Sequence, residues 1–422
     1  MSMTADANEA VVIIGAGIIG IACAHYLAAD GRKVIVLDKG TVAGACSHGN
    51  CGHVIPSHIL PLNSPDALKA GFFSLFDSKA PFRVKPQLRP SFLNWMLQFA
   101  RHCTKSHMLS GAGHLKSILD SSYDEFEALV SQVGFECDWK KSGLTYVFQS
   151  RKAFDAFEKT NTLLTERFDV AAQVIAGNDL TTFDPALKSG LAGGFFYQDD
   201  ALLRPDMLAL TWADQLRQKG VQFVEHCEVR GIEKDATRVN LIKTSKGDFG
   251  TGDVILAAGA LCGTLAAEFD CDIPVIPGKG YSVTIPRPEK CPKTSLVLSE
   301  KNVAITPFSN GLRFGSMMEF VGYDDSVPDH RVRQLTKSAD AYLEIDSSLP
   351  PVQPWFGWRP MTWDSLPMIG RLPKFKNATI ATGHGMLGVM LAPATGRLIA
   401  EIIGERPCHI PDAPFSPARF IH

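Results

Sequence analysis

Uninterrupted apolar runs and alternating patterns divide the chain into candidate strands and helices. Residues 11–14 (Val-Val-Ile-Ile) form a run without a polar position, which is typical of a strand buried on both faces. A helical stretch follows to about Leu27, and a second buried strand covers 33–37 and ends at Asp38. The order strand, helix, strand predicts a βαβ unit near the N-terminus.

The rest of the chain carries further segments with helix and strand patterns. Helices are predicted at 64–77, 91–107, 112–132, 151–168, 205–219, 329–345 and 387–403. Strands are predicted at 143–149, 221–224, 229–232, 253–260, 275–285, 303–308, 312–319 and 378–382. Segments typical of a dinucleotide-binding fold therefore recur at 10–55, about 200–280 and 360–410, with other material inserted between them.

The first turn of the βαβ unit reads Gly-Ala-Gly-Ile-Ile-Gly, which is the G-x-G-x-x-G pattern. Gly15 permits the tight turn, Gly17 lets the backbone approach a pyrophosphate, and Gly20 allows close packing of helix on strand. The helix start offers free N–H groups and a positive dipole end to phosphate. Asp38, 18 residues after Gly20, can accept hydrogen bonds from a ribose and repels the 2′-phosphate of NADP. The motif predicts a dinucleotide cofactor and leaves NAD and FAD open.

Two further segments have the small side chains that let a ligand approach the backbone. Residues 41–54 form a Gly-rich loop after the second strand. The strand at 253–260 runs into a turn that holds Ala258 and Gly259, where the adenine end of a dinucleotide can lie close. Both segments are therefore candidate walls of the cofactor site.

Composition and charge narrow the class of protein. The chain has 422 residues, of which 45% are hydrophobic and 20% charged, so it is globular and long enough for several domains. Its formal net charge is −2. A near-neutral balance argues against a nucleic-acid binder, which needs a basic face.

Residues 11–29 contain no Asp, Glu, Lys or Arg, and by length alone this segment could span a bilayer. The decapeptide before it carries Asp6 and Glu9 but no Lys or Arg, so the basic flank of a signal peptide is missing. Because the run coincides with the glycine motif, we expect no transmembrane segment. The predicted location is the cytoplasm, with peripheral contact to the inner membrane left open.

The ten cysteines are scattered and form no C-x-x-C pair. The segment C-S-H-G-N-C-G-H brings Cys46, His48, Cys51 and His53 together, and a metal site there is the alternative reading. We prefer reduced structural thiols in a reducing compartment and predict no metal.

Four spaced passages together resemble the D-amino acid oxidase superfamily of FAD enzymes, and among them most nearly the D-amino acid dehydrogenases. They are 275–282 (V-I-P-G-K-G-Y-S), 302–307 (N-V-A-I-T-P), 357–362 (G-W-R-P-M-T) and 383–388 (G-H-G-M-L-G). The resemblance covers most of the chain and is weakest at about 60–200. It implies FAD as the cofactor.

The resemblance also implies which residues contact FAD: the glycines of the motif at the pyrophosphate, Asp38 at the ribose, and 47–52 at the flavin. The full set is Gly15, Gly17, Gly20, Asp38, Lys39, Ser47, Asn50, Cys51, Gly52, Val229, Ala258, Gly259, Gly385, Met386, Leu387 and Gly388. Residues 385–388 open the last predicted helix. Its N-terminal N–H groups would stabilise the negative charge that the flavin's pyrimidine edge gains on reduction.

For activity, the resemblance implies oxidation of D-amino acids, with D-proline and D-hydroxyproline among the candidates, by hydride transfer from the α-carbon to flavin N5. Arg359 is the expected carboxylate-binding residue. Glycine oxidase has a second arginine where Met386 stands, and its carboxylate-binding tyrosine aligns with Ala304, so a different pocket is expected. Tyr281 either replaces that hydroxyl or is an ordinary strand residue. His53 either tunes the proton of the amine or only bonds the loop backbone.

The expected fold is α/β plus α+β. A Rossmann-like FAD-binding domain is assembled from 1–60, 200–280 and 360–422, and an inserted substrate domain with an antiparallel sheet comprises 61–199 and 281–359. The expected partners are a small amino acid and an electron acceptor, either a quinone or another member of an electron-transfer chain. Two other functions stay open: a glycine- or sarcosine-type oxidase that uses oxygen, and a flavin subunit that needs a second chain.

Overall fold

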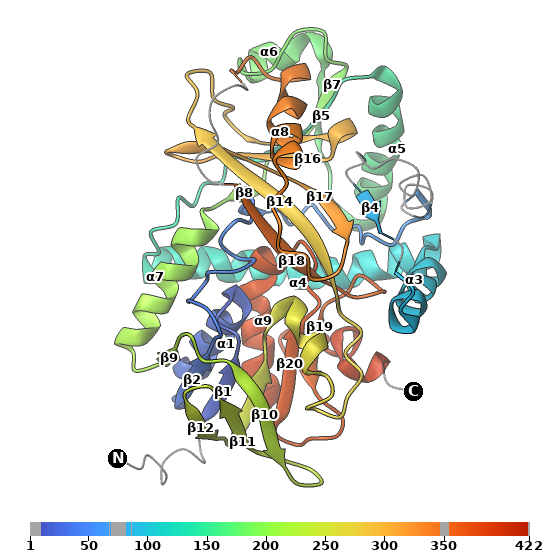
Figure 1. Cartoon of the computed structure of the whole chain (residues 1–422). Coiled ribbons are helices and arrows are strands. Elements are labelled where there is room, and N and C mark those ends of the chain that lie inside the picture. The colour runs from blue at the N-terminus through green and yellow to red at the C-terminus, as the bar shows by residue number, and fades with distance from the viewer. Residues whose placement is uncertain (1–9, 67, 69–81, 86, 347–353, 421–422) are drawn as a thin grey trace.

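The structure, a computed structural model, describes residues 10–66, 68, 82–85, 87–346 and 354–420. Figure 1 shows a parallel sheet in the lower half of the molecule and a larger, strongly twisted sheet above it. Segments far apart in the sequence meet in each sheet. This arrangement places the cofactor motif of the N-terminal unit directly beneath the larger sheet.

The N-terminal βαβ unit forms the middle of the parallel sheet. The strands, in spatial order, are β19 (Met368–Arg371), β20 (Ala378–Thr382), β13 (Asp253–Leu256), β1 (Val11–Ile14), β2 (Val34–Leu37) and β9 (Gln222–Val224), and only β19 among these is antiparallel to its neighbour. Val11 and Ile13 pack on the helical side of the sheet, whereas Val12 and Ile14 pack on the opposite side. Burial on both faces explains why β1 has no polar position.

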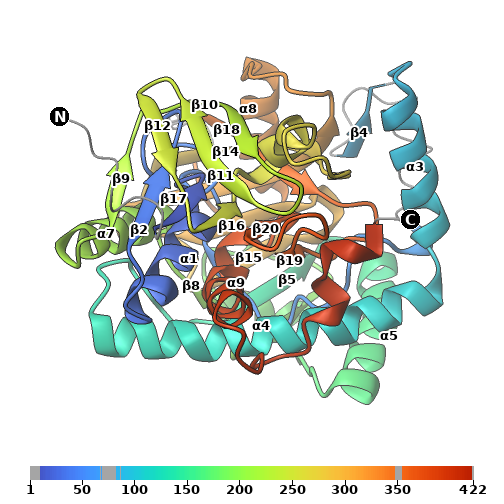
Figure 2. The ribbon, with the colours of Figure 1, turned by 90° about the horizontal axis from the view of Figure 1, so that it is seen from below.

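The two faces of the parallel sheet are covered by different layers (Figure 2). The helices of one layer are α1 (Ile18–Ala29), α9 (Gly388–Ile403), α7 (Pro205–Gln218) and the long α4 (Lys105–Val133). The other layer is a small antiparallel sheet of β10 (Val229–Lys234), β11 (Val239–Thr244) and β12 (Gly247–Gly250). Gly396 lets α9 approach α1 closely, because a Cβ there would lie 2.6 Å from the Ala22 carbonyl oxygen.

The larger sheet is largely antiparallel. Its strands, in spatial order, are β18 (Trp355–Met361), β14 (Ile276–Pro286), β17 (Gly311–Phe320), β16 (Val303–Pro307), β15 (Ser295–Leu298), β5 (Leu144–Phe148), β7 (Gly193–Tyr197) and β6 (Gln173–Ala176), with β4 (Phe82–Val84) beside β17. The pairs β5–β15 and β4–β17 are parallel. A parallel sheet together with a largely antiparallel one confirms the predicted fold class, while the predicted domain boundaries stay a prediction.

The remaining elements surround the larger sheet. They are the helices α3 (Pro90–His102), α5 (Arg151–Phe168), α6 (Leu180–Phe183) and α8 (Asp329–Lys337), and the short strand pair β3 (His53–Val54) and β8 (Ala201–Leu202). Among the described residues, no helix has both the length and the apolar character needed to cross a membrane. All ten cysteines carry free thiols, and no three described His, Cys, Asp or Glu side chains are grouped as metal ligands.

The helix boundaries differ from the sequence-based expectation at two places in the described chain. The predicted helices 91–107 and 112–132 meet at Cys103, and the second begins at Lys105 because the Thr104 hydroxyl accepts a hydrogen bond from His107 N. The helix predicted at 329–345 is α-helical only to Lys337. The helix predicted at 64–77 lies mostly outside the described residues.

Candidate active site

A cavity of about 830 Å³ is lined by residues of both sheets and by the N-terminal ends of α1 and α9. One end lies at the glycine motif and Asp38, and the cavity continues past the loop after β2 to Arg359 and the larger sheet. Two helix N-termini that open into one cavity favour a ligand with negative charge.

Steric requirements at the glycine motif come from the protein backbone itself. Gly15 has a φ of +114°, and a Cβ there would lie 2.4 Å from the Ala257 carbonyl oxygen. At Gly20 a Cβ would lie 1.9 Å from the Gly15 carbonyl oxygen, so Gly20 brings α1 onto β1 and does not itself line the cavity. Gly17 does line the cavity, and the nearest atom to a Cβ there is Ser47 Oγ at 3.6 Å. The turn therefore leaves the backbone at Gly17 open to a phosphate.

Asp38 is held at the carboxyl end of β2 by two backbone groups. Ala16 N donates to Oδ2 at 2.7 Å, and Gly40 N donates to Oδ1 at 2.8 Å. The carboxylate still lines the cavity, and each oxygen keeps a lone pair for a ribose hydroxyl. Val229 and Ala258 line the same end, where an adenine would lie.

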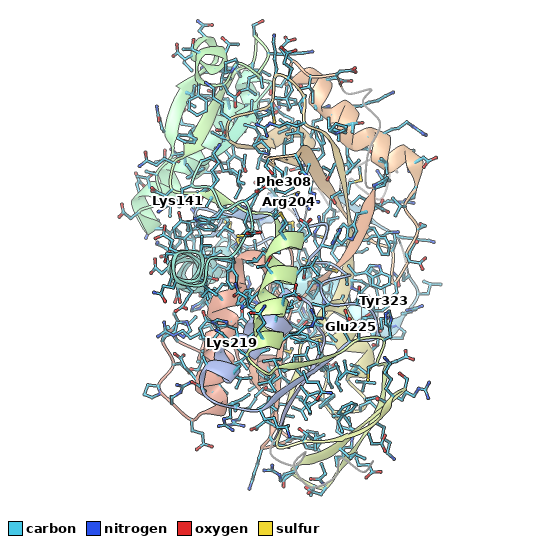
Figure 3. The ribbon with its side chains drawn as sticks, turned by 90° about the vertical axis from the view of Figure 1, so that its left-hand side faces the viewer. Lys141, Arg204, Lys219, Glu225, Phe308 and Tyr323 are labelled. Atoms are coloured by element: carbon cyan, nitrogen blue, oxygen red, sulfur yellow. The ribbon has the colours of Figure 1, made fainter. Side chains whose placement is uncertain are left out.

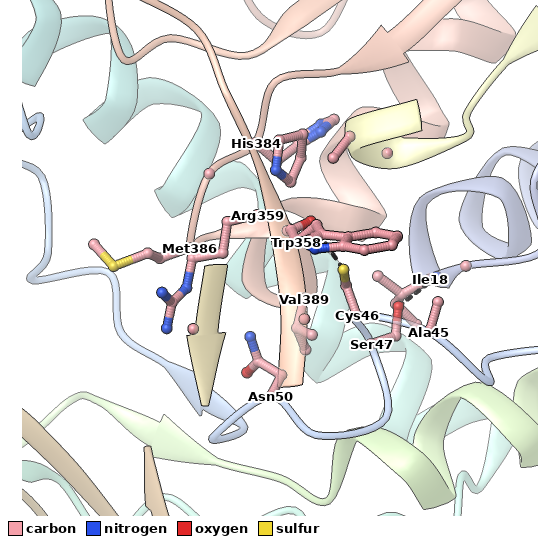
Figure 4. A pocket seen from close by; sticks show the side chains of 18 of the residues that line it. Ile18, Ala45, Cys46, Ser47, Asn50, Trp358, Arg359, His384, Met386 and Val389 are labelled. Carbon is pink, nitrogen blue, oxygen red and sulfur yellow. Dashed lines mark hydrogen bonds between the residues drawn. The ribbon is translucent and has the colours of Figure 1, made fainter. Parts of the chain in front are cut away.

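The loop after β2 joins the start of α1 to the larger sheet (Figure 4). Ser47 Oγ accepts a hydrogen bond from Ile18 N at 3.0 Å, and Cys46 Sγ donates to the Trp358 carbonyl at 2.9 Å. Asn50 Oδ1 accepts from Gly52 N at 2.8 Å. These bonds fix the loop in the wall of the cavity.

Arg313 and Thr306, which the sequence analysis missed, hold the same loop from the other side. The buried Arg313 guanidinium donates to the carbonyls of His48 and Asn50 at 3.1 and 2.9 Å, and Thr306 Oγ1 donates to the Cys51 carbonyl at 2.6 Å. A signal was present, since Arg313 is a charged residue between the apolar residues Leu312 and Phe314 of a predicted strand.

A phenylalanine supports this arginine. The Arg313 guanidinium carbon lies 4.9 Å from the ring centre of Phe308, and that of Arg204 lies 5.7 Å from the same ring. Figure 3 shows Arg204 and Phe308 side by side at the start of α7. Cation–π contacts on a buried ring thus help to keep the guanidinium in place.

The start of α9 contributes backbone N–H groups. Gly388, Val389 and Met390 line the cavity and form the first turn, whose N–H groups have no intrahelical acceptor. The turn is oriented by a hydrogen bond of 2.9 Å from Gly385 N to the Pro360 carbonyl. The buried His384 imidazole has its Nε2 3.0 Å from Thr395 Oγ1, and burial lowers its pKa to about 3, so it is neutral.

Arg359 lies on β18 and reaches over β14 into the cavity (Figure 4). Its guanidinium covers Gly280, where a Cβ would lie 2.2 Å from Nη1, and Nη1 donates to the Met317 carbonyl. Burial lowers the pKa of the guanidinium, and among the described residues no carboxylate pairs with it. Within the described lining, the other Asp, Glu, Lys or Arg side chains are Asp38, Lys39 and Glu228. The arrangement leaves Arg359 able to bind an anionic ligand.

The other two predicted catalytic side chains are engaged with the protein. Tyr281 packs with Val283 in the core on the α8 side of the sheet, and its hydroxyl donates to Glu319 at 2.6 Å. His53 is buried with Nε2 3.4 Å from the Ile305 carbonyl, and burial lowers its pKa to about 4. Both residues line the cavity, and their catalytic roles stay predictions.

Most predicted site residues are brought together by the fold. Those that line the cavity are Gly15, Gly17, Asp38, Lys39, Ser47, Asn50, Cys51, His53, Val229, Ala258, Gly259, Tyr281, Arg359, Gly385, Met386, Leu387 and Gly388. Gly20 and Gly52 do not line it. Gly52 has a φ of +72°, and a Cβ there would lie 1.9 Å from the Leu203 carbonyl oxygen, so it shapes the loop.

Comparison with known proteins gives consistent matches. A family profile described as "FAD dependent oxidoreductase" matches residues 10–402. D-Amino acid dehydrogenases of Neisseria meningitidis and Xanthobacter autotrophicus are 29% and 30% identical over 416 and 417 residues, covering 97% of this chain and 99% of each relative. The crystal structure of glycine oxidase from Geobacillus kaustophilus superposes with a TM-score of 0.79 at 22% identity and covers 98% of this chain and 99% of that one.

Proposed function

Because the chain belongs to the family of FAD-dependent oxidoreductases, as the resemblance predicted, we propose that it oxidises D-amino acids to imino acids by removing hydride from the α-carbon. The sequence relatives that are named D-amino acid dehydrogenases span nearly the whole chain and support this substrate class. The observation that carries the proposal is Arg359, a cation that faces the cavity without a paired carboxylate among the described residues.

The cavity fits FAD along its length. Asp38 would hold the ribose, the start of α1 with Ser47 would hold the pyrophosphate, and the start of α9 would hold the flavin's pyrimidine edge. Bound FAD supplies the acceptor for a hydride, which no side chain of the protein can supply.

Arg359 then fixes the substrate. A guanidinium fork binds a carboxylate through two parallel hydrogen bonds, so it sets both the position and the rotation of the α-carbon. The Met317 carbonyl, which accepts from Nη1, keeps the guanidinium in place. Withdrawal of the site from water strengthens the interaction with the carboxylate.

The surroundings favour the neutral form of the substrate amine. Burial holds the pKa of His53 at about 4 and that of His384 at about 3, so both imidazoles are neutral. Neither side chain offers the negative charge that would stabilise an ammonium group. The positive charge of Arg359 opposes a second cation nearby. The amine therefore binds deprotonated, and its lone pair assists departure of the hydride.

We extend the proposal to cyclic substrates such as D-proline and D-hydroxyproline, and to a quinone or another electron-transfer component as acceptor. Ser282 and Ala304 of the larger sheet line the cavity with small side chains, which would leave room for a ring. The name dehydrogenase on the relatives supports an acceptor other than oxygen. A membrane quinone would require peripheral contact with the inner membrane.

The test is anaerobic reduction of the purified yellow holoprotein. D-Amino acids, D-proline included, should bleach the visible flavin band, and their L-enantiomers should not. Bleaching by glycine or sarcosine alone, with hydrogen peroxide released in air, would replace the proposal by an amine oxidase. An inert chain that turns over only with a co-purified second chain would make it a flavin subunit.

A further inference from the structure

A row of residues crosses the floor of the cavity on the larger sheet. Strand register places Ser282 beside Gly315, Gly315 beside Ala304, Ala304 beside Val297, and Val297 beside Tyr146. All five line the cavity. The side chains of the row are small at the β14 end, where the Cys51 thiol lies over Gly315, and the row ends in the aromatic side chain of Tyr146 on β5.

Tyr146 forms a polar pair with His58, a residue outside the predicted site. The Tyr146 hydroxyl lies 3.2 Å from His58 Nδ1, and both side chains are partly buried and line the cavity. No described residue forms a hydrogen bond with His58 Nε2. The pair, which lines the cavity, therefore retains hydrogen-bonding capacity: the imidazole offers Nε2, and the hydroxyl can both donate and accept.

The position of His58 is determined by its neighbour in the chain. Ser57 N and Ser57 Oγ both donate to the buried carboxylate of Asp200, at 3.2 and 2.6 Å. Burial lowers the pKa of His58, so the imidazole is neutral at physiological pH. A neutral, preorganised pair suits a neutral polar group better than a charged one.

The pair and Arg359 lie at different ends of the floor. Arg359 is bonded to the Met317 carbonyl on β17, and Tyr146 lies on β5, three strands further on. Three strand spacings amount to roughly 14 Å between the backbones. A substrate whose carboxylate is held by Arg359 would thus direct its side chain, and not its amine, toward His58 and Tyr146.

We propose that His58 and Tyr146 form a side-chain subsite that binds a neutral hydrogen-bonding terminus, such as a carboxamide or hydroxyl, of the amino acid substrate. The inference rests on the proposed function, since it names the substrate class of that site. An apolar substrate side chain of the same shape would leave His58 and Tyr146 without hydrogen-bond partners. The lost hydrogen bonds would make the site prefer the polar substrate. A charged terminus would be desolvated without a counter-ion among the described lining residues.

The experiment measures binding of inert carboxylates to the holoprotein by titration calorimetry. Glutaramate and 5-methylhexanoate have the same shape, and neither has an amine that could be oxidised. We expect glutaramate to bind about tenfold more tightly. Tyr146→Phe should abolish most of this preference and leave the affinity for 5-methylhexanoate within about twofold.

Tyr197 provides a matched control, because its ring centre lies 5.9 Å from that of Tyr146. Its hydroxyl has no hydrogen-bond partner among the described residues, and Tyr197 is not part of the described cavity lining. Tyr197→Phe should keep the preference for glutaramate. Equal affinities in the wild type, or a preference that survives Tyr146→Phe, would overturn the subsite.

A second arm compares anaerobic flavin reduction by D-glutamine and by its isostere 2-amino-5-methylhexanoate of the D-configuration. Faster reduction by D-glutamine that is lost in Tyr146→Phe supports the subsite in turnover. If the inert carboxylates show the Tyr146-dependent preference but no D-amino acid reduces the flavin, the proposed function fails and the subsite stands.

Discussion

Replacement of Arg359 by methionine separates substrate binding from cofactor binding. Methionine retains the length of the aliphatic stem and removes the guanidinium, which lies over Gly280 in the cavity. Asp38 and the start of α9, which we propose to contact FAD, are unchanged. We therefore expect weak substrate binding in a protein with its normal flavin content.

The size of the expected increase in KM follows from the surroundings of the Arg359 guanidinium. Within the described chain no carboxylate pairs with Arg359, so the substrate carboxylate would be its charged partner. Loss of one charge-assisted clamp in a water-poor site costs roughly 2–4 kcal/mol. At about 1.4 kcal/mol for each tenfold change, KM for a D-amino acid should rise about 30- to 700-fold.

The assay is steady-state turnover with an artificial dye as acceptor, together with the flavin-to-protein absorbance ratio and a thermal unfolding curve. Because burial of the unpaired guanidinium already opposes its charge, the melting temperature should change little. Arg359→Lys keeps the charge but not the fork and should give an intermediate KM. An unchanged KM in Arg359→Met, with flavin bound, would refute the assigned role.

Three further predictions concern the cofactor end and a buried acid. Asp38→Ala should lower FAD occupancy after dialysis, read as the flavin-to-protein absorbance ratio; full occupancy would exclude a ribose contact. Gly20→Ala places a methyl group 1.9 Å from the Gly15 carbonyl oxygen, so its melting temperature should fall, and an unchanged value would contradict the packing argument. Burial raises the pKa of Asp200 from 3.8 to about 7, so the folded state keeps a proton that the unfolded chain releases, and stability should fall as pH rises through this interval. Between pH 5 and pH 8 the melting temperature should fall less in Asp200→Asn than in the wild type. Equal falls would show that Asp200 is not the source of the pH dependence.

Local patterns in the sequence were sufficient for several elements. The helix predicted at 151–168 is α5 with the same bounds, because Ser150 accepts a hydrogen bond from Ala153 N and Asp169 ends the helix in a left-handed conformation. By contrast, β3, β8 and β18 were not predicted. Their backbones are satisfied by partners far along the chain, and their short or mixed sequences carry no clear alternation.

In the candidate site, too, some residues could be predicted from local sequence patterns and others could not. The glycine motif and Asp38 could be read from the sequence because their steric and hydrogen-bonding requirements arise within one βαβ unit, as the contact from Ala16 N to Asp38 illustrates. By contrast, the hydrogen bond from Arg313 to the Asn50 carbonyl joins residues that are 263 positions apart in the chain. The contact between His58 and Tyr146 joins residues that are 88 positions apart. Such contacts depend on which strands of the larger sheet become neighbours and on their register. Neither is encoded in a local pattern, because each results from packing of the whole sheet against the cofactor-binding layers.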